Sequence, residues 1–168
     1  MLKKIKNLKQ FENKVFSQKK VSAKKFNSDY FNLKWRKDNS NYQIDIRRKI
    51  EGKNPILIKK IFRPKKALDM GCGPGALMYL LHELGVNCYG LDPSKDVKKI
   101  SPKKIQSKIK LGSTSMNNEK SNSYDLVICR EVFEHLTILE IKKAVSELSR
   151  ISSKYIYLTT RFHPKPAS

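Results

Sequence analysis

The sequence lacks the long apolar runs, the metal-binding motifs and the paired cysteines that mark several classes of protein. No stretch approaches the roughly 18 consecutive apolar residues of a membrane-spanning helix, and no apolar segment of secretory length follows the charged N-terminus. The cysteines Cys72, Cys88 and Cys129 are odd in number and widely spaced, which indicates reduced, buried thiols. No CxxC pair occurs and the histidines are scattered, so we expect no metal site. These absences favour a cytoplasmic protein.

Acidic residues are also scarce, above all in the first part of the chain. The 168 residues suit one domain and contain 36 Lys and Arg against 15 Asp and Glu, a formal net charge of +21. Residues 1–66 hold 21 of the basic residues and 5 of the acidic ones. Such a segment attracts RNA, acidic membrane surfaces or acidic substrates. It is also typical of a solvated, Lys-rich face, which is the interpretation we favour.

The first 42 residues differ in pattern from the rest and predict a basic N-terminal extension, helical or partly disordered. Within residues 1–25, apolar side chains recur at helical spacing, which predicts an amphipathic helix that packs on its own domain or frays, in preference to one that lies on a membrane. Residues 26–42 are rich in aromatics, Asn and Ser and predict an irregular segment. Three aromatic side chains there are expected to pack or to close over a pocket: Tyr30, Phe31 and Trp35.

Residues 43–168 predict a single α/β domain. Residues 43–62 fit two short helices with a break near Gly52–Pro55. Strand-like and helix-like segments then alternate, which is the pattern of βαβ units and a doubly wound, Rossmann-like parallel sheet with helices on both faces. The expected strands are 66–70, 87–91, 108–111, 124–129 and 154–159, and the expected helices are 76–84, 93–100 and 138–151.

The clearest motif is Leu68-Asp-Met-Gly-Cys-Gly-Pro-Gly75, which follows a strand and opens a helix. Glycines allow the backbone to turn sharply and to approach a ligand closely, and the helix N-terminus offers unpaired N–H groups. The spacing is G-x-G-x-G and differs from the dinucleotide fingerprint G-x-G-x-x-G. Asp69 would repel a pyrophosphate but would suit a ligand with an amino group and a sulfonium.

This stretch resembles the first motif of class I S-adenosylmethionine-dependent methyltransferases, of the small-molecule type 11 and 12 kind. Gly90-Leu-Asp-Pro-Ser94 and Tyr124-Asp-Leu-Val-Ile-Cys-Arg-Glu-Val-Phe-Glu-His-Leu136 resemble further family signatures in the expected order. The resemblance covers residues 42 to 160. It implies S-adenosyl-L-methionine as cofactor and a small-molecule methyl acceptor.

The resemblance also implies which residues hold the cofactor. The acid that ends the second strand, Asp92, would accept both ribose hydroxyls. Ser113 stands where the family usually has the Asp that meets the adenine amino group, so the contact would lack charge assistance. Arg130 would hold the cofactor carboxylate or an acidic substrate. The full set of expected cofactor contacts is Asp69, Gly71, Cys72, Gly73, Gly75, Asp92, Pro93, Ser113, Arg130 and Glu131.

His135 is the candidate general base, because it follows the fourth strand near the reactive end of the cofactor. Methyl transfer is an in-line displacement in which positioning supplies much of the rate, so a base matters only when the acceptor must lose a proton. Two other interpretations of His135 remain open: it bonds backbone groups near a helix start, or it bonds Glu131. The absence of an Asn-Pro-Pro-Tyr type motif after strand four argues against adenine or glutamine amides as acceptors.

The chain reaches only the fifth of the seven strands that the resemblance implies. We therefore expect a C-terminally incomplete domain whose strand at 154–159 forms an apolar edge open to association. Two alternatives to a small-molecule methyltransferase remain open: an RNA methyltransferase that uses the basic N-terminal segment, and a non-catalytic fragment or partner subunit.

Overall fold

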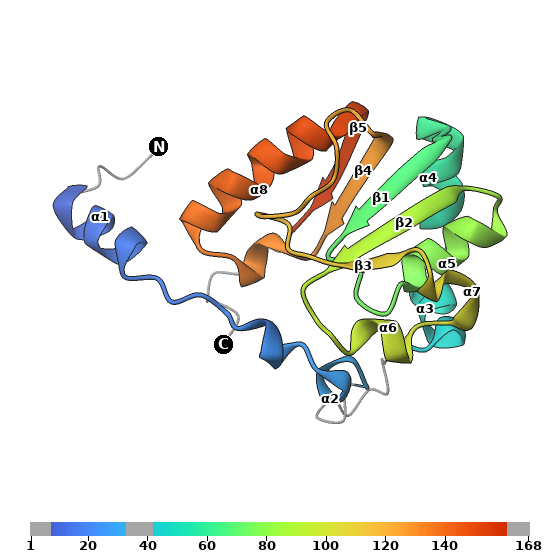
Figure 1. The fold of residues 1–168 in the computed structure, drawn as a ribbon, viewed down its shortest axis with the longest axis horizontal. Coiled ribbons are helices and arrows are strands. Elements are labelled where there is room, and N and C mark those ends of the chain that lie inside the picture. The colour runs from blue at the N-terminus through green and yellow to red at the C-terminus, as the bar shows by residue number, and fades with distance from the viewer. Residues whose placement is uncertain (1–7, 33–41, 161–168) are drawn as a thin grey trace.

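The computed structural model describes residues 8–32 and 42–160, which form one parallel sheet with helices on both faces (Figure 1). The strands are β1 Lys66–Met70, β2 Asn87–Asp92, β3 Ile109–Leu111, β4 Tyr124–Arg130 and β5 Ser152–Thr159. The helices before the sheet are α1 Leu8–Phe16, α2 Ser28–Asn32, α3 Ile44–Glu51 and α4 Asn54–Phe62. Those within the alternating part are α5 Ala76–Glu83, α6 Val97–Ile100, α7 Lys103–Gln106 and α8 Ile138–Ile151.

The strand order is β3-β2-β1-β4-β5, and every neighbouring pair is parallel. The chain moves outward from β1 to β3 and then returns to place β4 on the other side of β1. This reversal leaves a crevice at the carboxyl ends of β1 and β4, where open α/β sheets bind their ligands. Met70 lies opposite Leu91, and Asp69 lies opposite Ile128, so the ends of three strands meet at one edge.

Alternating side chains of the strands build two cores, one on each face of the sheet. Ala67 and Ile128 pack with Leu81 of α5 in one cluster. Leu68 packs with Leu148 of α8 in the other. The central strands are therefore buried on both sides, as expected for a parallel sheet, and the predicted α/β class with helices on both faces is confirmed.

The observed elements follow the expected ones most closely where the apolar pattern is strongest. The strand at 66–70 and the helix at 138–151 have the expected bounds, and α8 begins with a capping box between Thr137 and Glu140. The expectation of an irregular segment over 26–42 is partly wrong, because Ser28–Asn32 is helical. The helix expected at 93–100 begins only at Val97, and the short helix α7 was not anticipated.

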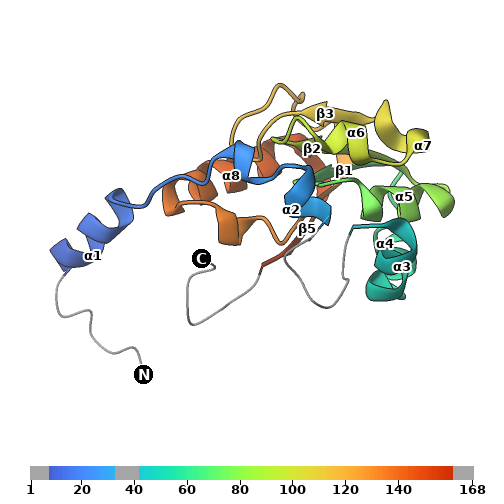
Figure 2. The same cartoon turned by 90° about the horizontal axis from the view of Figure 1, so that it is seen from below.

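The N-terminal segment crosses the carboxyl edge of the sheet (Figures 1 and 2). The Ile138 N–H, at the start of α8, donates a hydrogen bond to Gln18 Oε1 at 2.8 Å. The Ser28 N–H donates to Asp96 Oδ2, at the start of α6, at 3.2 Å. Residues 18–28 thus form a strap between two elements on opposite sides of the crevice. Of the helix expected over residues 1–25, α1 accounts for residues 8–16, and residues 17–22 are not helical. Residues 1–7 lie outside the described part of the chain.

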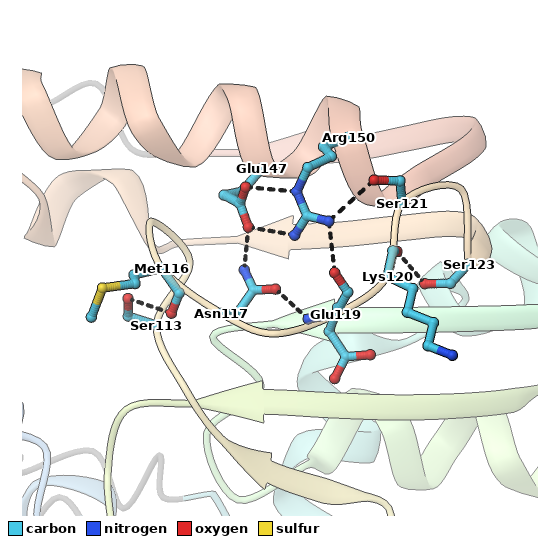
Figure 3. A network of polar contacts seen from close by, with 9 residues as sticks. All are labelled: Ser113, Met116, Asn117, Glu119, Lys120, Ser121, Ser123, Glu147 and Arg150. Atoms are coloured by element: carbon cyan, nitrogen blue, oxygen red, sulfur yellow. Dashed lines mark hydrogen bonds and ion pairs between the residues drawn. The ribbon is translucent and has the colours of Figure 1, made fainter.

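The connection between β3 and β4 is held against α8 by a polar network (Figure 3). Arg150 donates to the carbonyl of Glu119 at 2.7 Å and to both carboxylate oxygens of Glu147 at 2.8 Å. Glu147 in turn accepts from the Asn117 side chain at 2.9 Å. This network fixes a polar loop that has no helix of its own.

β5 is an edge strand with exposed apolar side chains: Tyr155, Ile156 and Leu158 are each more than 40 % exposed. Within residues 8–32 and 42–160, no helix has the length and apolar character needed to cross a membrane.

Candidate functional site

The glycine-rich turn joins the ends of three strands. The N–H groups of Gly71 and Cys72 both donate to the carbonyl of Leu91 in β2, at 2.7 and 3.2 Å. Gly71 has a φ of +82°, and a Cβ added there would lie 2.3 Å from Cγ2 of Val132, just after β4. Only a residue without a side chain fits this close approach. The turn therefore lies directly beneath the crevice.

Asp92 ties the end of β2 to the same turn. Its Oδ2 accepts from the Gly73 N–H and its Oδ1 from the Ser94 N–H, both at 2.9 Å. The carboxyl group is buried, and this burial raises its pKa although both backbone N–H groups lower it. Each oxygen keeps further lone-pair capacity toward the crevice.

Asp69, at the end of β1, is almost fully buried. Burial raises the pKa of its carboxyl group to about 7; the Arg130 guanidinium opposes the shift, and the carboxylates of Glu51 and Asp92 add to it. A buried carboxyl group that titrates near neutrality inside a crevice is a candidate for a functional role.

Two arginines share one buried carboxylate beside Asp69. Arg130 Nη1 lies 2.8 Å from Glu51 Oε2, and Arg47 Nη2 lies 2.9 Å from Glu51 Oε1. Burial raises the pKa of Glu51, but the two guanidinium groups and Asn54 outweigh it and hold that pKa below its ordinary value. Among the described residues, neither Arg47 Nε nor Arg130 Nε finds a hydrogen-bond partner. The cluster therefore has positive charge and buried donor capacity left for an anion.

Beyond β4, Glu131 adopts a φ of +54°, which is uncommon for a residue with a side chain. Its N–H donates to the carbonyl of Thr159 at 2.9 Å, and its carboxylate accepts from the Thr159 hydroxyl at 3.3 Å. His135 follows in a short 3-10 helix, and its ring lies 5.2 Å from that of Phe26 on the strap. Backbone strain of this kind clusters at functional sites.

Beyond β3, Ser113 Oγ donates to the carbonyl of Met116 at 3.2 Å. With its hydrogen directed to Met116, Ser113 Oγ can accept from the Ser115 hydroxyl, whose Oγ lies 3.5 Å away, and it keeps one lone pair for an amino group. Thr114 and Ser115 follow it along the wall of the crevice.

These groups surround one pocket of about 330 Å³. Nine of the ten expected cofactor contacts line it, together with His135: Asp69, Gly71, Cys72, Gly73, Asp92, Pro93, Ser113, Arg130 and Glu131. Gly75 does not line the pocket, since it caps α5 and packs against Ile105 of α7. Among the described residues, no group of three His, Cys, Asp or Glu side chains could hold a metal ion.

Comparison with known proteins agrees with this arrangement. Residues 68–155, just over half of the chain, match the family model of a methyltransferase domain. The chain belongs to the class I S-adenosylmethionine-dependent methyltransferases.

A curated relative within this family is the ubiquinone biosynthesis O-methyltransferase of Pelagibacter ubique. It is 34% identical over 94 residues, which cover 53% of this chain and 38% of the relative. The chain thus spans well under half the length of that methyltransferase.

Solved structures show the same fold. The PH0226 protein of Pyrococcus horikoshii OT3 superposes with a TM-score of 0.64 at 24% identity and covers 79% of this chain and 66% of its own. A putative S-adenosyl-L-methionine-dependent methyltransferase of Methanococcus maripaludis gives a TM-score of 0.55 at 22% identity, and the match covers 73% of this chain and 65% of that protein.

Several pocket residues come from the N-terminal side of the domain, and local sequence patterns do not distinguish them. Arg47 and Glu51 are four residues apart on α3, where nothing in the sequence separates them from a surface ion pair. Phe26 and Tyr42 belong to the aromatic-rich stretch, and no local pattern marks them as pocket residues. Tyr30 and Phe31 line the pocket as expected, and Trp35 lies outside the described residues. The domain boundary after residue 42 stays a prediction.

Proposed function

We propose that this chain binds S-adenosyl-L-methionine in the pocket at the carboxyl edge of the sheet and transfers its methyl group to a small-molecule acceptor. The observation that carries the proposal is the distribution of charge around the pocket. A buried acid, Asp69, lies beside a cationic pair of arginines, and a second acid, Asp92, lies at the end of β2. This pattern matches a ligand with an amino group, a carboxylate and a ribose diol.

Each part of the ligand has a suitable partner in the proposal. Asp69 faces the amino group, while Arg130, supported by Arg47, supplies donors to the carboxylate. Asp92 accepts from the ribose hydroxyls, beside Pro93. Ser113 is assigned to the adenine amino group, and Glu131 lies beside the methionine part. The backbone of Gly71, Cys72 and Gly73 allows the cofactor to approach the turn closely, whereas Gly75, which caps α5, shapes the turn without touching the ligand.

The chain's own contribution to catalysis is positioning and, for a protic acceptor, removal of a proton. When bound, S-adenosylmethionine supplies an electrophilic methyl group on a sulfonium. The walls of the pocket hold the acceptor atom in line with that group and exclude water. The His135 imidazole accepts the acceptor's proton, which it then releases to solvent.

Calorimetric titration of S-adenosylmethionine and S-adenosylhomocysteine into the purified chain tests the proposal. We expect micromolar binding that weakens by roughly tenfold or more in Asp92→Asn, because charge-assisted hydrogen bonds to the ribose are lost. Asp45→Asn, which removes an exposed carboxylate on α3, is the matched control and should bind like the parent. A folded chain that binds neither compound would favour a non-catalytic fragment or partner subunit.

RNA is a second candidate acceptor, favoured by exposed lysines on α6 and on the strap, whose Ala23 and Phe26 line the pocket. Lys24 and Lys25 of the strap are exposed, as are Lys98 and Lys99 of α6. Phosphate contacts would make binding fall steeply with salt, by roughly one order of affinity per tenfold salt for each neutralised phosphate. Filter binding of a short RNA at two salt concentrations separates this candidate from a small molecule.

The exposed edge of β5 supports a further part of the proposal, self-association. Among the described residues no strand pairs with its outer side, and an open strand edge with apolar side chains can recruit another strand. Sedimentation velocity across a concentration series, with Ile156→Lys as the disrupting variant, measures it. A monomer at every concentration would contradict it.

A further inference from the structure

Five aromatic rings form a continuous row along one side of the pocket. In order, they belong to His135, Phe26, Tyr30, Phe31 and Tyr42. Neighbouring ring centroids are 5.1 to 5.3 Å apart, and the planes meet at 71 to 90°. All five residues line the pocket. We call this row the aromatic wall.

The aromatic wall is fixed at several points. The strap that carries Phe26 is anchored by the Gln18 and Ser28 hydrogen bonds to the starts of α8 and α6. Phe31 is buried, and its ring lies so close to Gly73 that an added Cβ would be 3.2 Å from Cε1. The wall is therefore seated on the glycine-rich turn and does not depend on a ligand for its shape.

The chemistry of the wall selects a planar, apolar partner. Edge-to-face arrangements are the preferred geometry between aromatic rings, so a further ring can extend the row in the same way. A cationic ligand at the wall is disfavoured, because the Arg47 guanidinium already lies 5.0 Å from the centre of the Tyr42 ring. Arg130, which shares the Glu51 carboxylate with Arg47, adds a second positive charge. The polar groups proposed to hold the cofactor are separate residues, which leaves the wall without a role in that assignment.

We propose that the aromatic wall is the acceptor subsite and that the acceptor is a small aromatic hydroxyl compound whose O–H faces His135. This inference rests on the proposed function. The acceptor oxygen forms a bond to the methyl carbon while the carbon–sulfur bond breaks, and the electron pair of that bond stays on sulfur as a neutral thioether. The hydroxyl proton passes to the His135 imidazole and then to solvent.

Matched pairs of aromatic and saturated probes test the subsite. Phenol and catechol are compared with cyclohexanol and cyclohexane-1,2-diol by ligand-observed NMR, with the chain saturated with S-adenosylhomocysteine. We expect each aromatic probe to bind roughly three- to tenfold more tightly than its saturated partner. Equal binding within each pair, or no binding of the aromatic probes, would overturn the assignment.

Variants of one wall residue connect this preference to the wall. Phe26→Leu removes a half-buried ring and should abolish the aromatic preference, whereas Phe26→Tyr keeps the ring and should restore it. Phe62→Leu removes a ring that packs on Tyr155 and Tyr157, away from the pocket, and serves as the control. If Phe26→Leu keeps the full preference while remaining folded, the wall is not the subsite.

The same samples separate failure of the subsite from failure of the proposed function. S-adenosylhomocysteine affinity is measured first, and it should differ less than twofold between the parent and Phe26→Leu. If S-adenosylhomocysteine does not bind, the probe pairs are titrated into the free chain, and a Phe26-dependent preference there would support the subsite while the proposed function fails. If S-adenosylhomocysteine binds and no preference appears, the subsite fails and the proposed function stands.

Discussion

Glu51 and Arg130 join two distant parts of the chain, with Nη1 of the arginine 2.8 Å from Oε2 of the glutamate. Glu51 ends α3, and Arg130 ends β4, so the pair holds the helices before the sheet against the pocket. Removal of one partner leaves a buried charge without compensation, which is far more costly than loss of an exposed pair.

We therefore expect Glu51→Gln to lower the free energy of unfolding by about 3 kcal/mol, within the range for broken buried pairs. Urea unfolding at pH 7 measures it. Glu83→Gln is the control, because Glu83 pairs with Arg48 at an exposed position and should lose less than about 1 kcal/mol. Similar small losses in both variants would mean that the buried pair does not hold α3 in place.

Asp69 predicts a pH dependence of cofactor binding. Its pKa is raised to about 7, mainly by burial, so below pH 7 the free chain holds this carboxyl group protonated. A ligand ammonium binds the ionised form, and affinity for S-adenosylhomocysteine should rise roughly tenfold between pH 6 and pH 8. Calorimetry at several pH values measures the slope, which Asp69→Asn should remove. An affinity of the parent that does not change with pH would contradict the assignment.

The same shift has the opposite sign for the stability of the free chain. The folded state binds the Asp69 proton more tightly than the unfolded state does. Stability contributed by this group is therefore greatest below the ordinary pKa of 3.8 and is lost as the pH rises toward about 7. The Tm of Asp69→Asn minus the Tm of the parent should therefore be larger at pH 8 than at pH 5. A difference that is the same at both pH values would contradict the raised pKa of Asp69.

The loop between β3 and β4 should depend on Arg150. This residue contacts Glu119, Ser121 and Glu147 (Figure 3), and the loop it holds begins with the pocket residue Ser113. Arg150→Ala should speed amide hydrogen exchange over residues 113–121, because local opening becomes easier.

Arg150→Lys is the conservative comparison for this loop. It keeps the charge but not the planar fork of donors, so exchange should stay faster than in the parent. Arg48→Ala, which breaks an exposed pair elsewhere, should leave exchange in the loop unchanged. Unaltered exchange over residues 113–121 in Arg150→Ala would show that other contacts fix the loop.

The sheet and its carboxyl edge could be predicted from the sequence because they depend on local patterns. Glycine spacing and the acids at the ends of the strands are visible in the sequence, and parallel strands bring their carboxyl ends together by geometry. The positions of Asp69, Asp92 and Ser113 at this edge could therefore be predicted, and all three line the pocket. The position of Glu51 in the site could not be predicted, because its partner Arg130 lies 79 residues away. No local pattern indicates such a long-range ion pair.

The strap was missed for the same physical reason. Gln18 binds the start of α8 across 120 residues, and a glutamine in a Lys-rich segment carries no signal of that contact. The aromatic-rich composition of residues 26–42 indicates that Tyr30 and Phe31 pack or close over a pocket. It does not indicate that Phe26 and Tyr42 join them, because the order of the rings depends on where the strap crosses the sheet. Long-range contacts of this kind are set by tertiary structure and override local propensity.

Gly71 gives the sharpest test of the turn itself. Its φ of +82° disfavours any side chain, and an added Cβ would meet Cγ2 of Val132 at 2.3 Å. Two costs therefore combine in Gly71→Ala, backbone strain of about 1–3 kcal/mol and a steric clash. Chemical unfolding should show a loss at or above the upper end of that range. Val132→Ala removes the clashing methyl group but leaves the backbone strain, so the double variant should recover only part of the loss. Full recovery would mean that the backbone conformation contributes nothing, and no recovery would mean that the clash is relieved elsewhere.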